Sequence, residues 1–400
     1  MPTYPVKNET AASKKKPRVL FVAGILGKNG ISSHIRTLAE GLLAREWDVG
    51  IAASELKDGA PLSREFMASR GIAYFQVPFP DFIRSSGNLG NALKSTFRMN
   101  AAARSFKPDV IHVHGLGTVP FAYVTGRFRK IPLVSTCHNT PPPRTEALAR
   151  KLSGANKYLN AILGNRVIAI SRDMQTVMED LWKVQPRRVK LILHGVEGSH
   201  FRPPSVSERI TARRSFNLRP EDKVVCLVGR LDHTKGHDVL LRAIARLRSD
   251  GCSAVALFGG VGPLKSAIER MAKDLGVADQ VHLLGFTDAR TVLWASDAFV
   301  LPSRREGFPL VILEAMLCGV VPIRTPAAGA FEQIEDAVNG FIVPFDDDEN
   351  LAQRLSQVLG NSELRSRMSQ SSVERARRKF TSEIMLDETV ATYREVGAVL

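Results

Sequence analysis

Residues 224–236, VVCLVGRLDHTKG, contain the unit from which this chain is built. The apolar run Val224–Val228 fits a buried strand, and the glycine that follows lets the backbone approach a ligand closely. A helical pattern of apolar residues begins after Gly236. A strand, a turn and a helix in this order form the repeating unit of a parallel sheet with helices on both faces.

This unit recurs in two series along most of the 400 residues. The first series starts near Pro17, and a stretch bearing prolines and arginines around residues 196–220 precedes the second. With 44% apolar residues the chain can bury two cores, so we predict an α/β protein with two Rossmann-like, doubly wound parallel-sheet domains facing a central cleft. The expected strands are Val19–Ala23, Val49–Ala53, Tyr74–Val77, Val110–His114, Leu133–Cys137 and Val167–Ile170, then Val224–Gly229, Ala254–Phe258, Val281–Leu284, Ala298–Leu301, Val320–Arg324 and Phe341–Val343.

The domain boundaries follow from the same patterns. Residues 1–16 are polar and lack periodicity, which predicts a disordered lead-in. We expect an N-terminal domain over residues 17–200 and a C-terminal domain over residues 201–380. Residues 381–400 are expected to form a helix that packs back towards the N-terminal domain.

The formal net charge of +15 comes entirely from the first half of the chain. Residues 1–200 contain 29 lysines and arginines against 14 acidic residues, whereas residues 201–400 contain 26 of each. A basic half favours an anionic partner, although a merely solvated basic surface is the alternative. We expect a membrane surface or an anionic acceptor rather than nucleic acid, because aromatic residues, 7% of the chain, do not interleave with the basic ones. The candidate contact residues are Arg98, Arg104, Arg127, Arg129 and Lys130.

Apolar stretches of membrane-spanning length are missing from the sequence, and no apolar segment resembling a secretion signal follows the Lys14–Lys16 run. We therefore expect a cytoplasmic protein, with peripheral attachment to the inner face of the membrane as the alternative. The sequence carries no signal for an oligomeric state.

Two elements of the second half suit a diphosphate. Arg230 and Lys235 place cations after a strand at the mouth of the expected cleft, where they would stabilise a leaving group that gains negative charge. The glycine-rich run Gly259–Pro263 precedes another helix, whose first N–H groups attract anions. Each element has a simpler explanation, namely two solvated surface cations and a turn that needs glycine for its conformation.

The stretch Pro302–Met316, PSRREGFPLVILEAM, is the most informative. Glu306 lies in the loop after a strand, and a helix is expected to start near Pro309, with N–H groups at residues 307–310 open to an anion. Glu314 falls inside this helix among apolar residues, where a carboxylate is costly to bury without a partner such as the hydroxyls of a ribose.

This stretch resembles the E-x7-E signature of glycosyltransferase family 4, and Gly229-Arg230 with Lys235-Gly236 resembles that family's G-R…K-G element. Residues 328–332 and 339–344 are similar to its G-G-x-x-E and N-G-x-x-V-P segments. The resemblance implies a GT-B fold, a C-terminal domain that binds the donor, an N-terminal domain on the acceptor side, and retention of anomeric configuration without a metal. It implies donor-binding roles for Gly30, Gly229, Arg230, Lys235, Gly259, Gly262, Gly285, Phe286, Glu306, Gly307, Phe308, Pro309, Leu310 and Glu314, and catalytic roles for Glu306, His138, Arg230 and Lys235.

The loop Gly24–Gly30, after the first strand, allows a second interpretation. With Glu55 beyond the next strand it suggests a dinucleotide-binding site and hence an NAD(P)-dependent oxidoreductase. The glycine spacing is G-x2-G-x2-G rather than G-x-G-x-x-G, so we rank this interpretation second. The glycosyltransferase family has Gly-Gly here, whereas this chain has Asn29-Gly30, which leaves the role of Asn29 open.

Three histidines gather in the first half. His112 and His114 alternate on one strand and share a face, and His138 ends the next strand. Three imidazoles could bind a metal, but buried neutral histidines are the more common arrangement, and we expect neither a metal nor a cofactor. The family resemblance implies acceptor-side roles for Asn29, His114 and His138.

These observations predict a retaining hexosyltransferase that moves a sugar from a nucleotide diphosphate sugar to a glycan or lipid-linked acceptor, in cell-surface polysaccharide or glycolipid synthesis. A UDP-sugar is the favoured donor and a GDP-sugar the second choice. The alternatives are the oxidoreductase and a catalytically silent protein that binds a nucleotide sugar.

Overall fold

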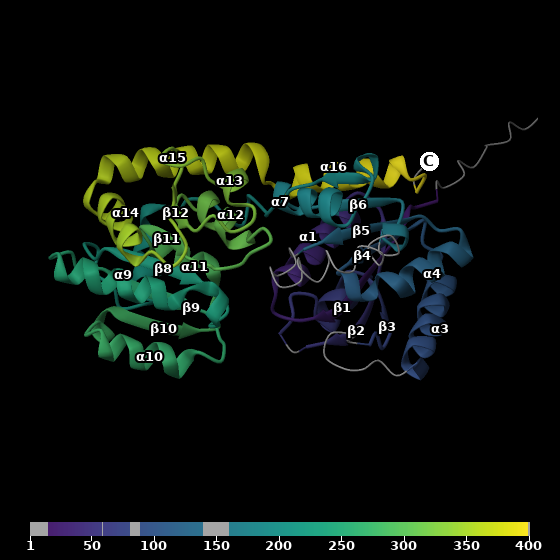
Figure 1. Cartoon of the computed structure of the whole chain (residues 1–400), viewed down its shortest axis with the longest axis horizontal. Helices are drawn as coiled ribbons and strands as arrows, with labels where there is room; N and C mark the ends of the chain where they lie inside the picture. The colour runs from purple at the N-terminus through teal and green to yellow at the C-terminus, as the bar shows by residue number, and fades with distance from the viewer. Residues whose placement is uncertain (1–14, 58, 81–88, 139–159, 399–400) are drawn as a thin grey trace, which may run out of the picture.

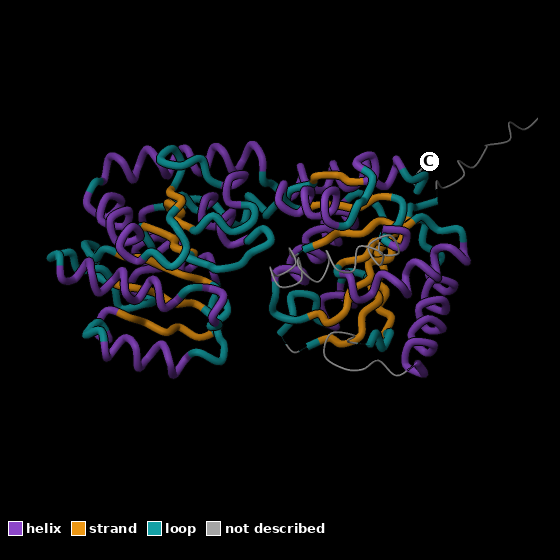
Figure 2. Tube along the Cα trace, viewed as in Figure 1, coloured by secondary structure: helices purple, strands orange, loops and turns teal. Residues whose placement is uncertain are grey.

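The computed structural model describes residues 15–57, 59–80, 89–138 and 160–398 as two lobes lying side by side (Figure 1). In each lobe a parallel sheet lies between layers of helices (Figure 2), so the predicted α/β fold class is confirmed. Most of the predicted lead-in, residues 1–14, lies outside the described part. The described helices include none that is both long and apolar enough to cross a bilayer.

The N-terminal lobe has a seven-stranded sheet in the order β3-β2-β1-β4-β5-β6-β7, with every neighbouring pair parallel. Along the first strand, β1, Val19 and Phe21 face one core cluster while Leu20 and Val22 face the other, because successive side chains point to opposite faces. The elements are β1 (Arg18–Leu26), α1 (Gly30–Ala44), β2 (Asp48–Leu56), α2 (Arg64–Ser69), β3 (Ala73–Gln76), α3 (Leu89–Phe106), β4 (Val110–His114), α4 (Val119–Arg129), β5 (Leu133–Cys137), β6 (Arg166–Ala169), α7 (Arg172–Thr176) and β7 (Val189–Leu191).

The C-terminal lobe repeats this plan with six parallel strands in the order β10-β9-β8-β11-β12-β13. The first strand in sequence, β8, is central and pairs with β9 and β11, which makes the edge beyond it the point where ligands bind in open α/β sheets. The elements are α8 (Val206–Arg214), β8 (Val224–Val228), α9 (His237–Ser249), β9 (Val255–Gly259), α10 (Lys265–Asp274), β10 (Val281–Gly285), α11 (Ala289–Ala295), β11 (Ala298–Leu301), α12 (Leu310–Leu317), β12 (Val321–Arg324), α13 (Ala330–Gln333), β13 (Phe341–Ile342), α14 (Asp348–Gly360) and α15 (Ser362–Lys379). The last helix, α16 (Ser382–Glu395), packs on the N-terminal lobe.

The predicted strands differ from the observed ones mainly at their ends. The short strand β7 (Val189–Leu191) was not expected, because three residues are too few to show a periodic pattern. The helix expected near Pro263 begins two residues later, at Lys265, and Pro309 is the N-cap of α12 rather than a residue inside it.

The chain crosses between the lobes twice at the same place. The N–H of Val196 donates to the carbonyl of Phe380 at 3.0 Å, and the N–H of Ser382 donates to the carbonyl of Val196 at 3.0 Å. A Cβ on Gly195 would lie 2.1 Å from the carbonyl oxygen of Thr381, so only glycine allows the two crossings to lie this close.

After the second crossing, helix α16 runs back across the N-terminal lobe (Figure 1). Its apolar face, with Met385 and Val390, belongs to the core cluster that includes Leu38 and Leu42 of α1. Its buried Tyr393 hydroxyl lies 2.6 Å from Nδ1 of His112, whose Nε2 lies 2.7 Å from the Thr136 hydroxyl. The C-terminal helix therefore forms part of the N-terminal core and satisfies a buried histidine on β4.

Replacing Tyr393 by phenylalanine should lower the free energy of unfolding by about 1–3 kcal/mol, because Nδ1 of His112 would lose its partner in a dry core. Tyr74→Phe is the matched control: the Tyr74 hydroxyl is buried with no hydrogen-bond partner, so its loss should be neutral or stabilising. Urea denaturation of both variants measures the difference. Equal effects would contradict a stabilising role for the Tyr393–His112 contact.

Candidate functional site

A cleft of about 660 Å³ lies between the carboxyl edges of the two sheets. The N-terminal lobe contributes the loop after β1, the start of α1 and the end of β5, and the C-terminal lobe contributes the loops after β8 and β11 and the first turns of α12. The cleft includes most of the predicted site. Its lining consists of Ile25, Gly27, Lys28, Asn29, Gly30, Ile31, Ser33, Lys57, His138, Ile170, His194, Val228, Gly229, Arg230, Lys235, Glu306, Gly307, Phe308, Pro309, Leu310, Val311 and Glu314.

The closest charged pair in the cleft is Lys235 with Glu306. The ammonium of Lys235 lies 2.6 Å from Oε1 of Glu306, and only 8% of the glutamate side chain is exposed. Gly236 fixes this geometry: its φ is +71°, and a Cβ there would meet the carbonyl oxygen of Pro302 at 2.1 Å. An ammonium has three donors, so two remain for phosphate oxygens while the third holds the carboxylate in place.

Arg230 lies at the mouth of the same cleft. Its side chain is 70% exposed and its Nε is 3.4 Å from a carboxylate oxygen of Asp232. This weak, solvated contact leaves the guanidinium able to reach an anion that enters the cleft. Gly229 lines the cleft at the end of β8. Its N–H donates to the carbonyl of Gly259 at 2.8 Å, which continues the pairing of β8 with β9 to the edge of the cleft.

The glycine-rich loop after β9 borders the cleft without lining it. A Cβ on Gly262 would lie 2.3 Å from the carbonyl oxygen of Leu231, and Gly260 has a φ of +145°. Close packing against the β8 loop therefore accounts for these glycines. Gly259 and Gly262 were predicted to bind the donor, and neither is among the residues that line the cleft.

Gly285 and Phe286 lie across the cleft from the first loop of the N-terminal lobe. The Phe286 ring is 63% exposed, and Nζ of Lys28 lies 3.8 Å from its centroid. This cation–π contact joins the two lobes beside Gly285 and Phe286, two of the residues to which the family resemblance gives donor-binding roles. The sequence analysis did not single out Lys28, because its contact with Phe286 joins residues of two different lobes.

Glu314 lies in the second turn of α12, partly accessible from the cleft and otherwise surrounded by apolar residues. Burial, with a further contribution from Asp288, raises the pKa of this carboxyl to about 7. A carboxyl held at this cost in an apolar helix suits hydroxyl partners, as the sequence analysis expected.

Arg324, at the end of β12, is a fully buried arginine that the sequence analysis missed. Its guanidinium donates to the carbonyls of Thr325, Ala327 and Ala328 and to the side chain of Gln333. Burial lowers the pKa of Arg324 to about 10, and Glu306 acts in the opposite direction. The arginine therefore fixes the loop at residues 325–329 behind the cleft and adds positive charge beneath Glu306.

The two lobes touch at the floor of the cleft. A Cβ on Gly307 would lie 2.0 Å from the carbonyl oxygen of His138, so the glycine permits this approach. Two further contacts join α7 to the α13 region: the N–H of Arg172 donates to Glu332 at 2.6 Å, and the N–H of Gly329 donates to Asp173 at 3.0 Å.

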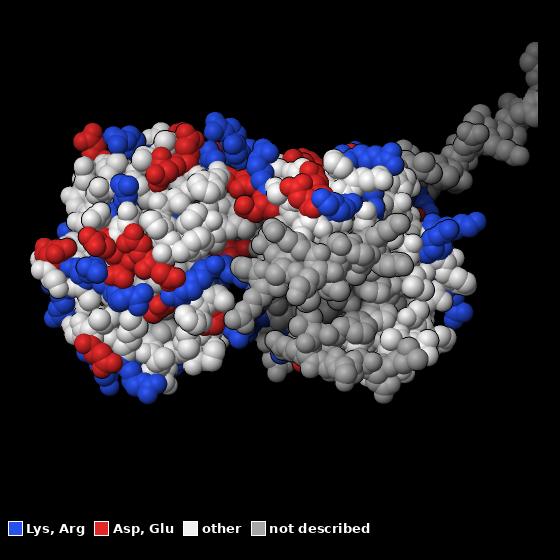
Figure 3. All heavy atoms as spheres, in the orientation of Figure 1, with Lys and Arg blue, Asp and Glu red and all other residues white. Residues whose placement is uncertain are grey.

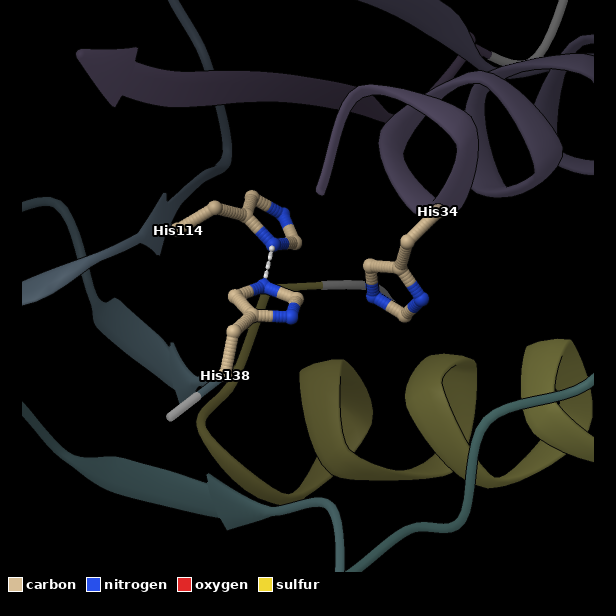
Figure 4. Close-up of side chains that lie close together, drawn as sticks. All are labelled: His34, His114 and His138. Carbon is tan, nitrogen blue, oxygen red and sulfur yellow. Dashed lines mark hydrogen bonds between the residues drawn. The ribbon is translucent and has the colours of Figure 1, made fainter. Parts of the chain in front are cut away.

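Histidines form the N-terminal wall. Nδ1 of His114 lies 3.0 Å from Nε2 of His138, and the His34 ring on α1 points towards both (Figure 4). Burial lowers the pKa of His138 to about 3, and burial with neighbouring imidazoles holds the pKa values of His34, His114 and His194 well below the usual range. These side chains are neutral near pH 7, so they offer hydrogen bonds rather than charge.

The structure distinguishes the predicted acceptor-side residues from one another. His138 lines the cleft, whereas His114 lies behind it, 2% exposed, and supports His138. The side chain of Asn29 accepts from the N–H of Ser32 at 2.9 Å and caps α1. Its amide oxygen is therefore already bonded at the start of the helix, although the residue lines the cleft. His194, which the sequence analysis did not single out, also lines the cleft.

The histidine wall is also where a metal would fit. One ligand atom from each of His34, His114 and His138 lies within 4.8 Å of the other two, and neutral imidazoles are the form that binds metals. The hydrogen bond between His114 and His138 satisfies one nitrogen of each ring without an ion. The absence of a metal therefore stays a prediction.

A larger hollow, of about 820 Å³, lies on the C-terminal lobe between α9 and α14. Its arginines Arg242 and Arg246 both pair with Asp348, so these two cations already have a partner. Only the cleft between the lobes combines closely placed cations, carboxyls and histidines within the described part of the chain.

Comparisons with known proteins identify the family of this chain. The family described as "Glycosyltransferase Family 4" matches residues 28–199, and that described as "Glycosyl transferases group 1" matches residues 208–375. A D-inositol 3-phosphate glycosyltransferase of Frankia alni is 30% identical over 87% of this chain and 90% of its own length. The chain therefore belongs to the glycosyltransferase family that these matches define. An uncharacterized glycosyltransferase of Methanocaldococcus jannaschii is 26% identical over 91% of this glycosyltransferase and 94% of the relative.

Solved structures resemble the glycosyltransferase in fold. A glycosyltransferase from Rickettsia africae has a TM-score of 0.81 and 19% identity, covering 95% of this chain and 98% of its own. Anabaena HepE in complex with UDP and glucose has a TM-score of 0.79 and 19% identity, covering 95% and 100%. The fold is the GT-B arrangement of two parallel-sheet domains.

Glu314 gives a pH-dependent test of the site. Its pKa of about 7 lies above the ordinary 4.5, so the native state retains a proton that the unfolded chain releases, and stability falls as pH rises between these values. Glu314→Gln removes this cost. The variant should exceed the parent in free energy of unfolding by roughly 2–3 kcal/mol near pH 8, with the excess shrinking towards pH 5.

Denaturation at several pH values measures this difference, with Glu374→Gln on the exposed face of α15 as the matched control. The control should change little at any pH. A Glu314→Gln effect that does not vary with pH would contradict the raised pKa.

Proposed function

We propose that this glycosyltransferase is a retaining hexosyltransferase that transfers a sugar from a UDP-sugar to a glycan or lipid-linked acceptor. The proposal depends above all on the contact between Lys235 and Glu306 at the floor of a cleft that both lobes line. A cation with free donors, next to a carboxylate held in place, suits a diphosphate beside a sugar ring.

In the proposed reaction the bond between the anomeric carbon and the β-phosphate oxygen breaks, and a bond from the acceptor hydroxyl oxygen forms on the same face. The departing phosphate takes the hydroxyl proton. Lys235 and Arg230 stabilise the charge that develops on the diphosphate, which lowers the barrier more than it strengthens binding of the intact donor. Glu306 accepts hydrogen bonds from the sugar, and Glu314 from the ribose.

His138, a neutral histidine that lines the cleft, gives the N-terminal lobe a role other than stabilising charge in the proposed reaction. His138 bonds to His114 through Nε2, so its Nδ1 remains for a hydroxyl of the transferred sugar or of the acceptor. With its pKa lowered to about 3, His138 orients a hydroxyl rather than supplying a proton.

Relatives support the choice of donor and the acidic nature of the acceptor. Anabaena HepE has a structure in complex with UDP-glucose, which favours a UDP-sugar here. The name D-inositol 3-phosphate glycosyltransferase points to a phosphorylated acceptor in those relatives. In this chain Lys28 and Lys57 line the acceptor half of the cleft and would attract an anionic acceptor.

Glu306→Gln should reduce transfer by about a hundredfold or more at an unchanged fold, because the amide keeps the shape but neither pairs with Lys235 nor accepts hydrogen bonds at both positions. Release of UDP from UDP-glucose with and without acceptor measures the effect, and Glu374→Gln should match the parent. Unchanged turnover in Glu306→Gln would remove the assigned role.

Donor binding separates the proposal from its alternatives. UDP-glucose at about a hundred times its Kd should stabilise the protein by about 2.7 kcal/mol, whereas NAD⁺ should leave the thermal midpoint unchanged. A shift with NAD⁺ alone would favour an oxidoreductase. Donor binding without UDP release, with any acceptor from a panel of phosphorylated and lipid-linked sugars, would indicate a silent binding protein.

Chelation tests the expected independence from metal. Because Lys235 and Arg230 would carry out the charge stabilisation, transfer should continue at the same rate after dialysis against EDTA. Loss of activity that a divalent ion restores would contradict this and direct attention to His34, His114 and His138.

A further inference from the structure

Helices α3 and α4 lie next to each other at the end of the N-terminal lobe (Figure 1). Their outer faces carry large apolar side chains. Phe97 of α3 is 75% exposed and Phe128 of α4 is 76% exposed. Leu93, one turn before Phe97, and Val124, one turn before Phe128, are also exposed. Single exposed apolar residues are common, but four on two packed helices form a patch, here called the α3–α4 face.

The inner faces of both helices pack in the core of the lobe, so the apolar side chains on their outer faces need a separate explanation. Met99 and Ala103 of α3 and Ala122 of α4 are buried in the core cluster under the sheet. One side of each helix is therefore already packed against the rest of the lobe. The phenylalanines on the opposite side are left mostly in solvent, and their place on the surface points to a partner.

The charged residues around the α3–α4 face are almost all basic. Residues 89–131 contain seven lysines and arginines and a single acidic residue, Asp109. Asp109 already accepts from the backbone N–H of Arg18 and pairs with Lys15, away from the patch. Basic side chains project at the edge of the lobe where α3 and α4 lie (Figure 3). Those adjoining the patch are Lys94, Arg98, Arg104, Arg127 and Lys130, and none pairs with a described acidic residue.

We propose that the α3–α4 face docks onto an anionic phospholipid bilayer, with Phe97, Phe128, Leu93 and Val124 entering the headgroup boundary and the surrounding lysines and arginines contacting lipid phosphates. Aromatic and aliphatic side chains on one side of a helix, bordered by basic residues, match the chemistry of such an interface. This inference goes beyond sugar transfer, because binding to lipid needs neither donor nor acceptor.

Nucleic acid is the other anionic partner to weigh. The expectation that aromatic and basic residues do not interleave is wrong at this surface, where Arg127, Phe128 and Arg129 are consecutive. Nucleic-acid platforms, however, stack bases on aromatic rings along a basic groove. Here half of the apolar patch is aliphatic and the face is made by the outer sides of two helices, which suits a bilayer better.

The test is co-sedimentation of the full chain with vesicles of phosphatidylcholine, with and without about one-third phosphatidylglycerol. Binding should require the anionic lipid and weaken when salt rises from about 0.1 M to about 0.5 M. Phe97→Ser/Phe128→Ser and, separately, Arg98→Glu/Arg127→Glu should each lower the partition constant at least about tenfold. The substituted side chains are exposed, so the thermal midpoint should stay near that of the parent.

Matched changes on the C-terminal lobe serve as controls. Arg270→Glu/Lys273→Glu on α10 alters the net charge equally, and Val206→Ser removes another exposed apolar side chain. Both should bind vesicles like the parent, and UDP release from donor should be the same in all variants. The proposal is overturned if the parent ignores anionic vesicles, if the control pair weakens binding as much, or if single-stranded oligonucleotide binds where vesicles do not.

Discussion

The double crossing between the lobes is the constraint on which the rest of the structure depends. Val196 bonds to both Phe380 and Ser382, and Gly195 lets the two segments approach because it has no side chain. The second crossing continues into α16, whose apolar face is part of the N-terminal core. Two adjacent connections, one of them anchored over a whole helix, hold the carboxyl edges of both sheets towards each other, and the cleft results from this arrangement.

Within the cleft the two lobes contribute different electrostatics. The C-terminal lobe supplies charge: Lys235 beside Glu306, the exposed Arg230, and the buried Arg324 behind them. The N-terminal lobe supplies neutral imidazoles, because burial lowers the pKa of His138 to about 3. Lys28 and Lys57 are the cations that this lobe adds to the lining. Fixed groups of this kind need little reorganisation when charge develops in the reaction.

Charge is also divided on the outside of the molecule. Residues 201–400 contain equal numbers of basic and acidic residues, and many of their arginines pair with carboxylates of the same lobe, as Arg304 does with Asp238 and Asp346. The excess of the N-terminal half has fewer such partners and gathers in part around Phe97 and Phe128. The same lobe thus presents neutral imidazoles beside Lys28 and Lys57 to the cleft, and a further group of basic side chains to the outside.

The sequence by itself determined the strand and helix alternation, the two-lobed fold class and the positions of Lys235, Glu306 and Glu314, because spacing along one strand, loop or helix fixes these features. Only the tertiary structure decided that His34 and His194 join His138, that Lys28 reaches Phe286 across the cleft, and that Arg324 is buried beneath Glu306. It also assigned the Asn29 amide to capping and the loop glycines to close packing. Such contacts join residues far apart in the chain, and the burial that sets their pKa values exists only once both lobes are packed.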